Sequence, residues 1–322
     1  VNIDYDAWEI GSMYESLPVK LKEQAEISPL FSQKEEPCSS KALPGRLISG
    51  ILVKRKLHNS ALVQRITLES GSRRIDFHTT IDWKEHHKLL KVEFPVSVCA
   101  DEAIYEIQFG YVKRPNHMSR RYDADRYEVC CHRYTALAEA EHGVAVLNDC
   151  KYGVSVNGSS INLTLLKAPV IPDMYADQGK HTFTYSLYIY NGSFADGGTV
   201  QNAYELNFPV QKAEGAEAES LFTVVEGSSS AVRAPRAPCS VLLETVKEAD
   251  DGSGDVVLRL YESQKTTVNC TLHCLWKIKK AFQTDMKEEN AKELDFNGDS
   301  VPLRFQPFEI KTLRLQFIRK VR

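Results

Sequence analysis

The alternation of apolar and polar residues in the segment RRIDFHTTIDW, residues 73–83, most limits how this chain can fold. Side chains on a strand alternate between its two faces, so one face carries Ile75, Phe77, Thr79, Ile81 and Trp83. The opposite face then carries Arg74, Asp76, His78 and Asp82. A period of two over this length predicts a strand with one face in a core, and it is incompatible with an amphipathic helix.

Segments of the same kind recur along the chain and are separated by turn residues. They are residues 62–70, 88–98, 102–112, 161–170 and 181–190. Because few helical periods intervene, this series predicts stacked antiparallel sheets. A helical pattern is confined to residues 14–26 and 201–207.

The composition changes after this first set of strands. Residues 211–240 are first acidic and Ala-rich and then rich in Gly, Ser and Pro, which predicts a connection or a long surface loop. Two apolar runs joined by Asp-Asp-Gly-Ser-Gly-Asp follow within residues 240–263 and predict a hairpin. Further strands are expected within residues 266–286 and 301–318. We therefore expect a β domain over residues 1–210, and a linker with a small β-sandwich over residues 211–322.

The composition excludes several classes of protein. The 322 residues carry a net charge of -3 with mixed signs, which does not favour nucleic acid or an anionic membrane surface as a partner. No apolar run approaches the roughly 20 residues that span a bilayer, and no signal peptide is recognised. Because the chain begins with Val1, we expect a processed chain or an excised fragment.

Cysteine usage favours a reducing compartment. Eight cysteines in a chain of this length are too sparse for a disulfide scaffold, so we expect free thiols and a cytoplasmic location. The competing signal is four N-x-[ST] tripeptides, which matter only in a secreted protein. They begin at Asn157, Asn162, Asn191 and Asn269.

Three clusters of potential ligands or nucleophiles have simpler structural readings. His86 and His87 are neighbours in sequence, so in a strand they would point to opposite faces and could not share one ion. Cys270, His273 and Cys274 lack a fourth ligand at zinc-finger spacing, which favours a half-buried strand. Cys130-Cys131-His132 places a thiol beside an imidazole, but adjacency in sequence does not provide the hydrogen bond that activates a thiolate.

Two polar loops follow strong strands, LNDCKYG at residues 147–153 and PDMYADQGKH at residues 172–181. Most such loops are solvated turns. An aromatic ring beside a carboxylate, an ammonium and amides would also suit a sugar, with the ring against the pyranose face and polar groups on the hydroxyls. From the residues alone, both readings stay open.

Four long blocks carry a resemblance to a known family. They are RIDFHTTIDWKEHHKLLKVEFPVSV, YEIQFGYVKRPNH, RYEVCCHRYTALAEAEHGVAVLNDCKYGVSVNG and LTLLKAPVIPDMYADQGKHTFTYSLYIY. Together they resemble the C-terminal half of glycoside hydrolase family 38, the α-mannosidases, in its cytosolic and bacterial branch. The resemblance implies an all-β fold, a mutarotase-like supersandwich of stacked antiparallel sheets followed by a small β-sandwich.

The resemblance also implies what this chain leaves to other parts of the protein. In the family, an N-terminal α/β domain and a helical domain hold a catalytic Asp and a zinc ion bound by Asp and His, and the enzyme retains configuration while hydrolysing terminal α-D-mannose. We therefore expect neither a catalytic residue nor a metal ligand here, and no hydrolysis by this chain alone. The implied partners are an α-mannoside oligosaccharide and the missing domains. The oligomeric state stays open, a homo-oligomer included.

The matching blocks place six residues in loops that lean over the catalytic domain of such an enzyme. By this resemblance, the substrate-binding candidates are Asp149, Lys151, Tyr152, Asp177, Gln178 and Gly179. They would line the substrate entrance and bind sugar hydroxyls. The alternative is that they attach the β region to the missing domains.

Two other functions remain as hypotheses. One is a free-standing carbohydrate-binding β module without chemistry. The other is a mutarotase-like isomerase, which needs a general acid and a general base near the anomeric carbon, for which His132 and Glu128 are candidates.

Overall fold

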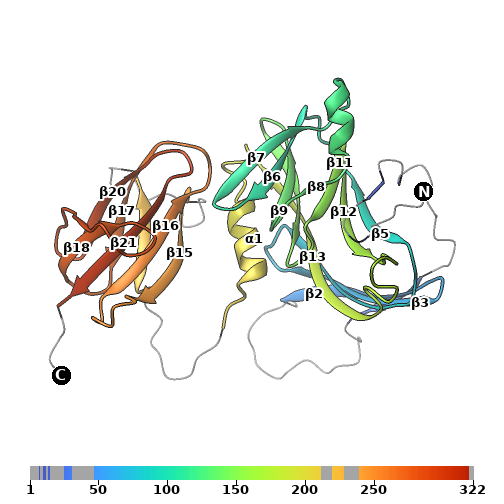
Figure 1. Ribbon diagram of the computed structural model, residues 1–322, viewed down its shortest axis with the longest axis horizontal. Helices are drawn as coiled ribbons and strands as arrows, with labels where there is room; N and C mark the ends of the chain where they lie inside the picture. Colours follow the sequence, from blue (N-terminus) through green and yellow to red (C-terminus); the bar gives the residue numbers. More distant parts are fainter. Residues whose placement is uncertain are drawn as a thin grey trace. The chain divides into compact units, whose positions relative to one another are not determined.

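The computed structural model describes residues 7, 10–11, 14, 25–30, 47–211, 220–227 and 239–318 of the chain. It divides into two compact units (Figure 1). The first contains residues 1–106 and 112–209, and the second contains residues 107–111 and 210–322.

A nine-stranded sheet is the larger layer of the first unit, counted over the described residues. Its strand pairs are antiparallel, as the sequence predicted. In spatial order its strands are β1 (Glu26–Pro29), β2 (Ile48–Leu57), β3 (Ser60–Glu69), β4 (Arg74–Trp83), β13 (Gly179–Asn191), β10 (His142–Asn148), β9 (Tyr134–Ala138), β6 (Glu102–Ile107) and β7 (Gly110–Pro115). The long strands at its centre are rich in β-branched and aromatic residues, which give the sheet an extended apolar face.

A four-stranded antiparallel sheet forms the second layer of the first unit, again among the described residues. Its strands in order are β5 (Leu89–Pro95), β12 (Ser160–Lys167), β11 (Gly153–Asn157) and β8 (Val129–Cys130). The core lies between the two sheets, where Phe77 and Tyr185 stack at 5.1 Å between ring centroids and Phe94 of β5 meets both edge-on. The predicted stacked antiparallel sheets are confirmed.

Strand β4 shows the two faces that its sequence predicts. Thr79, Ile81 and Trp83 are buried on the core side. Asp76, on the other face, is buried as well, because Arg74 pairs with its carboxylate at 2.8 Å and Ser186 donates to it at 2.6 Å. A buried charge is tolerated when it is paired and hydrogen-bonded in this way.

The second unit contains a three-stranded and a five-stranded sheet, over the part of the chain that the structure describes. In spatial order, the strands of the three-stranded sheet are β14 (Phe222–Glu226), β17 (Val268–Cys274) and β20 (Ser300–Phe305). Those of the five-stranded sheet are β15 (Val241–Glu248), β16 (Val256–Glu262), β21 (Ile310–Phe317), β18 (Ile278–Thr284) and β19 (Lys292–Glu293). Residues of both sheets share one apolar core, which confirms the small β-sandwich. The hairpin expected within residues 240–263 is β15–β16.

Two strand predictions were wrong. Residues 102–112 form two strands, β6 and β7, because Phe109 takes a left-handed backbone conformation with φ 56° and turns the chain. Phe222–Glu226, which lies in the expected connection, pairs with β17 as strand β14. The alternation FTVVE is a strand pattern that the surrounding Gly, Ser and Ala obscured.

The helical predictions have different outcomes. Residues 201–207 lie in helix α1 (Thr199–Asn207), as expected. Most of the segment 14–26 lies outside the described residues, and its last residue, Glu26, begins β1 instead of continuing a helix. None of the helices in the described part of the chain is long and apolar enough to cross a membrane.

Candidate functional site

The first candidate loop, Asn148 to Gly153, is called the Asn148 loop below. Its first residue is 1% exposed and fixes the loop from inside. The Asn148 side-chain amide donates to the carbonyl of His132 at 2.7 Å, and its oxygen accepts the backbone N–H of Lys151 at 2.7 Å. The Asn148 carbonyl also accepts from Asn207, the last residue of α1, at 3.0 Å. These bonds define the shape of the loop before any ligand is considered.

Asp149 continues the pairing of β10 with β13 by using its side chain as well as its backbone. Its N–H donates to the carbonyl of Thr184 at 3.1 Å, and its Oδ2 accepts the N–H of Thr184 at 2.8 Å. The other oxygen, Oδ1, is buried and has no hydrogen-bond partner in the described part of the chain. Burial and the neighbouring carboxylate raise the pKa of the Cys150 thiol to about 11.

Lys151 and Tyr152 offer the groups of this loop that a ligand could use. The Lys151 ammonium lies 4.4 Å from the ring centroid of Phe183 and makes no hydrogen bond to a described residue. Tyr152 is 49% exposed, and its ring lies 5.2 Å from that of His132. An exposed aromatic face beside an available ammonium is a combination that sugar-binding sites use.

The second candidate loop, Asp173 to Gly179, is called the Asp177 turn below. Asp177 is exposed and has a φ of 60°, and its carbonyl lies 2.9 Å from Nε2 of His181. The Gln178 amide donates to the carbonyl of Glu85 at 2.5 Å. Gly179 has a φ of 108°, which favours glycine, and it opens β13 opposite Trp83.

The structure places both loops along the first half of β13. The Asn148 loop lies beside Phe183 and Thr184, and the Asp177 turn lies at Gly179. Gly179 and Thr184 are five residue steps apart along the strand, or about 17 Å at the rise of a β-strand. The six candidate residues therefore form two separate groups at different positions along β13.

Of the two candidates for an isomerase, Glu128 is engaged in a network of its own, whereas the His132 ring lies beside Tyr152 of the Asn148 loop. The Glu128 carboxylate pairs with the Lys91 ammonium and accepts from the hydroxyls of Tyr14 and Thr164. These partners hold the carboxylate, whereas a general base must be available to the substrate. This network could not be predicted from sequence patterns, because its members lie far apart along the chain.

Buried thiols explain the cysteine clusters. Cys131 is buried, and burial raises the pKa of its thiol to about 12, so it is not an activated nucleophile. Cys270 and Cys274 point into the core of the second unit, and His273 points away from it, as the half-buried strand predicted. Burial raises the pKa of these two thiols to about 12 and about 11, which opposes thiolate ligation of a metal.

Metal ligands are not gathered anywhere in the described residues, where no group of three or more His, Cys, Asp or Glu side chains could hold an ion. His86 and His87 are both exposed. They lie in a turn after β4, so the expected surface position is confirmed, although the expected strand geometry is wrong.

Comparisons with known proteins agree on one family. The sequence profile described as "Glycosyl hydrolases family 38 C-terminal domain" matches residues 2–175, and that of the "Glycosyl hydrolases family 38 C-terminal beta sandwich domain" matches residues 240–313.

Relatives and a solved structure extend this match. The chain is 42% identical over 261 residues to Alpha-mannosidase 2C1 of Homo sapiens, covering 80% of this chain and 24% of the relative. It is 34% identical over 320 residues to Alpha-mannosidase G of Dictyostelium discoideum, covering 96% of this chain and 28% of the relative. The crystal structure of an alpha-mannosidase from Enterococcus faecalis V583 is 19% identical with a TM-score of 0.69, covering 92% of this chain and 35% of that one.

These matches cover most of this chain but only about a quarter of the length of the relatives. They include the blocks that contain the Asn148 loop and the β-sandwich of the second unit. The chain belongs to glycosyl hydrolase family 38, whose C-terminal β domains it carries.

Proposed function

We propose that this chain is the C-terminal β region of an α-mannosidase that hydrolyses terminal α-D-mannose with retention of configuration. The observation that carries the proposal is identity of 34% and 42% to two curated alpha-mannosidases over most of this chain. Because the chain spans only about a quarter of those relatives, the catalytic Asp and the zinc ligands belong in the remainder of the protein. Its role here is to shape the mannoside pocket and to pack on the catalytic and helical domains.

Within this function, the Asn148 loop and the Asp177 turn line the substrate entrance. Lys151 and Tyr152 support this role, because the ammonium and the exposed ring are not consumed by hydrogen bonds within the described residues. An ammonium donates to sugar hydroxyls, and a ring packs on the C–H face of a pyranose. Asp149 contributes by fixing the shape of the loop, since its Oδ2 accepts a hydrogen bond from the Thr184 backbone.

A second role for these loops is attachment to the missing domains. Strand β13 pairs with β4 over Gly179–Tyr188, but its pairing with β10 covers only Tyr185–Asn191. On the side of β13 that faces β10, the Asp149 side chain bonds to the backbone of Thr184. Between Gly179 and Phe183, no described strand pairs with this side of β13. Exposed strand edges are common docking sites for another segment of chain.

Lys151→Met in the complete protein separates the two roles. Methionine keeps an apolar contact with the Phe183 ring and removes only the charge. For a residue at the substrate entrance, we expect kcat/KM for an aryl α-mannoside to fall at least about tenfold, with the free energy of unfolding unchanged. Equal losses of activity and stability favour the attachment role, and no change in either contradicts both. Lys56→Met, at an exposed position of β2 outside both loops, is the matched control.

The isolated chain tests where the chemistry resides. We expect no cleavage of an aryl α-mannoside by residues 1–322 with added zinc, and zinc-dependent cleavage by the complete protein. Turnover by the isolated chain would show that the catalytic groups lie in these domains. The free thiols of the described cysteines support a cytoplasmic location for this enzyme.

A further inference from the structure

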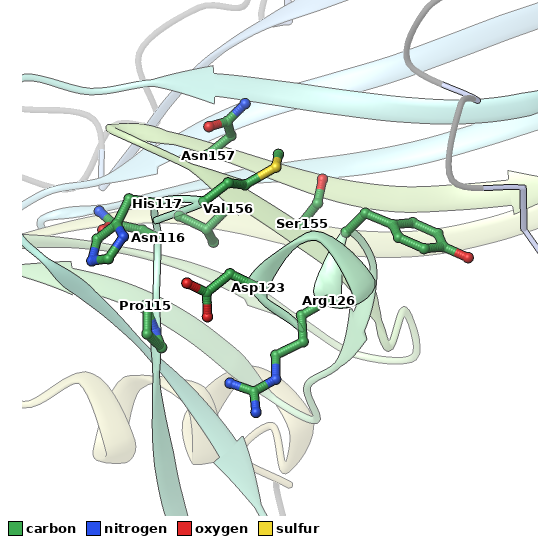
Figure 2. A pocket seen from close by; sticks show the side chains of 10 residues that line it. Pro115, Asn116, His117, Asp123, Arg126, Ser155, Val156 and Asn157 are labelled. Atoms are coloured by element: carbon green, nitrogen blue, oxygen red, sulfur yellow. The ribbon is translucent and has the colours of Figure 1, made fainter. Parts of the chain in front are cut away.

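Two cavities of the first unit differ in what they could hold. The smaller, of about 40 Å³, lies beside the 3-10 helix η2 (Arg121–Arg126) and is shown in Figure 2. One oxygen of Asp123 is buried there without a hydrogen-bond partner among the described residues, but Arg126 and Asn157 lie on opposite sides of Asp123. These groups do not converge on one ligand. The larger cavity has a volume of about 440 Å³, a size at which small-ligand sites occur.

The larger cavity, which we call the His78 groove, lies on the polar face of the nine-stranded sheet. Its floor consists of alternate residues of three neighbouring strands, Arg65, Thr67 and Glu69 of β3, Arg74, Asp76 and His78 of β4, and Thr184 of β13. In the strand pairing, Arg65 lies opposite His78, and His78 lies opposite Thr184. Paired side chains share a face with their Cβ atoms about 5 Å apart. The guanidinium, the imidazole and the hydroxyl therefore project side by side.

Helix α1 forms one wall of the groove through Glu205 and Leu206. The wall is tied to the floor, because the Arg74 guanidinium donates to the Asn202 carbonyl at 3.2 Å. Glu205 follows Asn202 by three residues and so lies on the same face of the helix, one turn further along. The groove is therefore built from a sheet and a helix that are bonded to each other.

Three groups in the groove remain available to a ligand. Arg65 is exposed, and its guanidinium makes no hydrogen bond or ion pair to a described residue. The His78 ring uses Nδ1 in a hydrogen bond of 3.2 Å with the Thr184 hydroxyl, and no described residue bonds to its Nε2. Glu205 is exposed and accepts from Gln201 at 3.0 Å through one of its two oxygens. The groove thus offers both donors and acceptors.

The charges of the groove favour a neutral ligand. Arg74 and Asp76 pair with each other at 2.8 Å. Arg65 shares the groove with two further carboxylates, those of Glu69 and Glu205. An anion would meet these carboxylates, and an organic cation would meet the Arg65 guanidinium. The described residues contain no group of three or more His, Cys, Asp or Glu side chains that could hold a metal ion.

Sugar hydroxyls match the available groups. A hydroxyl donates one hydrogen bond and accepts others, so neighbouring hydroxyls can donate to Glu205 and accept from Arg65. Nε2 of His78 donates or accepts according to its tautomer. Leu206 and Pro209 also line the groove and can contact the C–H groups of a sugar ring. A few converging polar groups beside apolar contacts are typical of small-ligand sites.

We propose that the His78 groove is a carbohydrate-binding site that holds a neutral sugar unit of a glycan through Arg65, His78 and Glu205. The site binds glycan without taking part in bond cleavage. It therefore goes beyond the proposed function, on which only the choice of mannose as a probe rests.

The His78 groove is separate from the candidate substrate entrance. In the Asn148 loop, the Lys151 ammonium lies beside Phe183, whose ring belongs to the core of the first unit. Thr184 is the next residue of β13 and points to the opposite face, where it lines the groove. A sugar in the groove and a sugar at Lys151 would therefore lie on different sides of the sheet.

Saturation-transfer NMR with methyl α-D-mannopyranoside tests the proposal on the 322-residue chain, whose two units each have their own core. We expect saturable binding that weakens at least about tenfold in Arg65→Met, which removes the charged donors and keeps an extended side chain. Arg304→Met, at an exposed strand position of the second unit, should bind as the unaltered chain does. Glu205→Ala should also weaken binding. Gln201→Ala removes the same hydrogen bond within α1 but keeps the carboxylate, so it should bind normally.

The ligand control is 2-methoxytetrahydropyran, a related ring without ring hydroxyls, which should give no signal. Absence of saturable sugar binding overturns the proposal, and so does binding that Arg65→Met and Glu205→Ala leave unchanged. Binding that disappears only in Tyr152→Ala also overturns it, because the sugar would then occupy the Asn148 loop. Displacement of the sugar by an equal concentration of inorganic phosphate would identify an anion site instead. The assay measures binding without hydrolysis, so its failure leaves the α-mannosidase proposal standing.

Discussion

The Asn148 loop and the Asp177 turn contain similar residues but differ in how far their shape depends on side-chain bonds. In the Asn148 loop, the polar side chains of Asn148 and Asp149 bond to backbone groups and extend the pairing of β10 with β13. In the Asp177 turn, Asp177 is exposed, and the shape depends on positive φ angles at Asp177 and Gly179. Side-chain bonds therefore hold the first loop, whereas the second combines left-handed backbone conformations with side-chain bonds such as that of Gln178 to the Glu85 carbonyl.

The largest expected difference concerns stability. Asn148→Ala removes the partners of two backbone groups, the His132 carbonyl and the Lys151 N–H. We expect the free energy of unfolding to fall by about 2–3 kcal/mol, because buried groups without partners are costly. Urea unfolding measures this loss. Asn157→Ala, at an exposed position, should change it by less than about 0.5 kcal/mol, and equal effects would contradict the role assigned to Asn148.

Gly179→Ala tests the other mechanism. At a φ of 108° any side chain strains the backbone, although no described residue other than the two chain neighbours has an atom within 4 Å of the added Cβ. We expect a loss of about 1–2 kcal/mol in the free energy of unfolding. Lys180→Ala, one residue along, should have almost no effect. If Gly179→Ala were equally harmless, the turn would not depend on its left-handed conformation.

Cys150 reports on the carboxylate of the Asn148 loop. The residue is exposed, but partial burial of its thiol and the neighbouring Asp149 carboxylate raise the thiol pKa to about 11, so little thiolate forms at pH 8. We expect alkylation by iodoacetamide at least about tenfold slower than that of free cysteine. Asp149→Asn removes the charge and should accelerate the reaction at Cys150, as mass spectrometry of the labelled peptide can follow. An unchanged rate would show that Asp149 does not act on this thiol.

The smallest expected effect distinguishes two exposed tyrosines. Tyr152 belongs to the Asn148 loop and Tyr175 to the Asp177 turn, and neither is buried. In the complete enzyme, we expect Tyr152→Ala to raise KM for a mannoside about threefold to tenfold, as loss of one aromatic contact predicts. Tyr175→Ala should change KM by less than about twofold, with stability unaltered in both variants. The reverse order would assign the substrate to the Asp177 turn.

Strand patterns were readable where local sequence decides the structure. Residues 73–83 alternate clearly and became a central strand with the expected core face, and residues 181–190 became part of another central strand. The turn inside residues 102–112 was missed, because Gln108 and Phe109 are not typical turn residues and Phe109 adopts φ 56° without being Gly or Asn. Strand Phe222–Glu226 was missed because the residues on both sides of it, rich in Ala, Gly, Ser and Pro, dominate the composition of the segment.

The sequence by itself determined the all-β class, the core face of β4 and the family, since these depend on periodicity and on long contiguous blocks. Only the tertiary structure decided that Asp149 bonds to Thr184, 35 residues away, and that Asp123 carries a buried oxygen without a partner in the described chain. A hydrogen bond depends on distance and angle between groups that the fold brings together. Residue type gives the capacity to bond, and packing selects the partner.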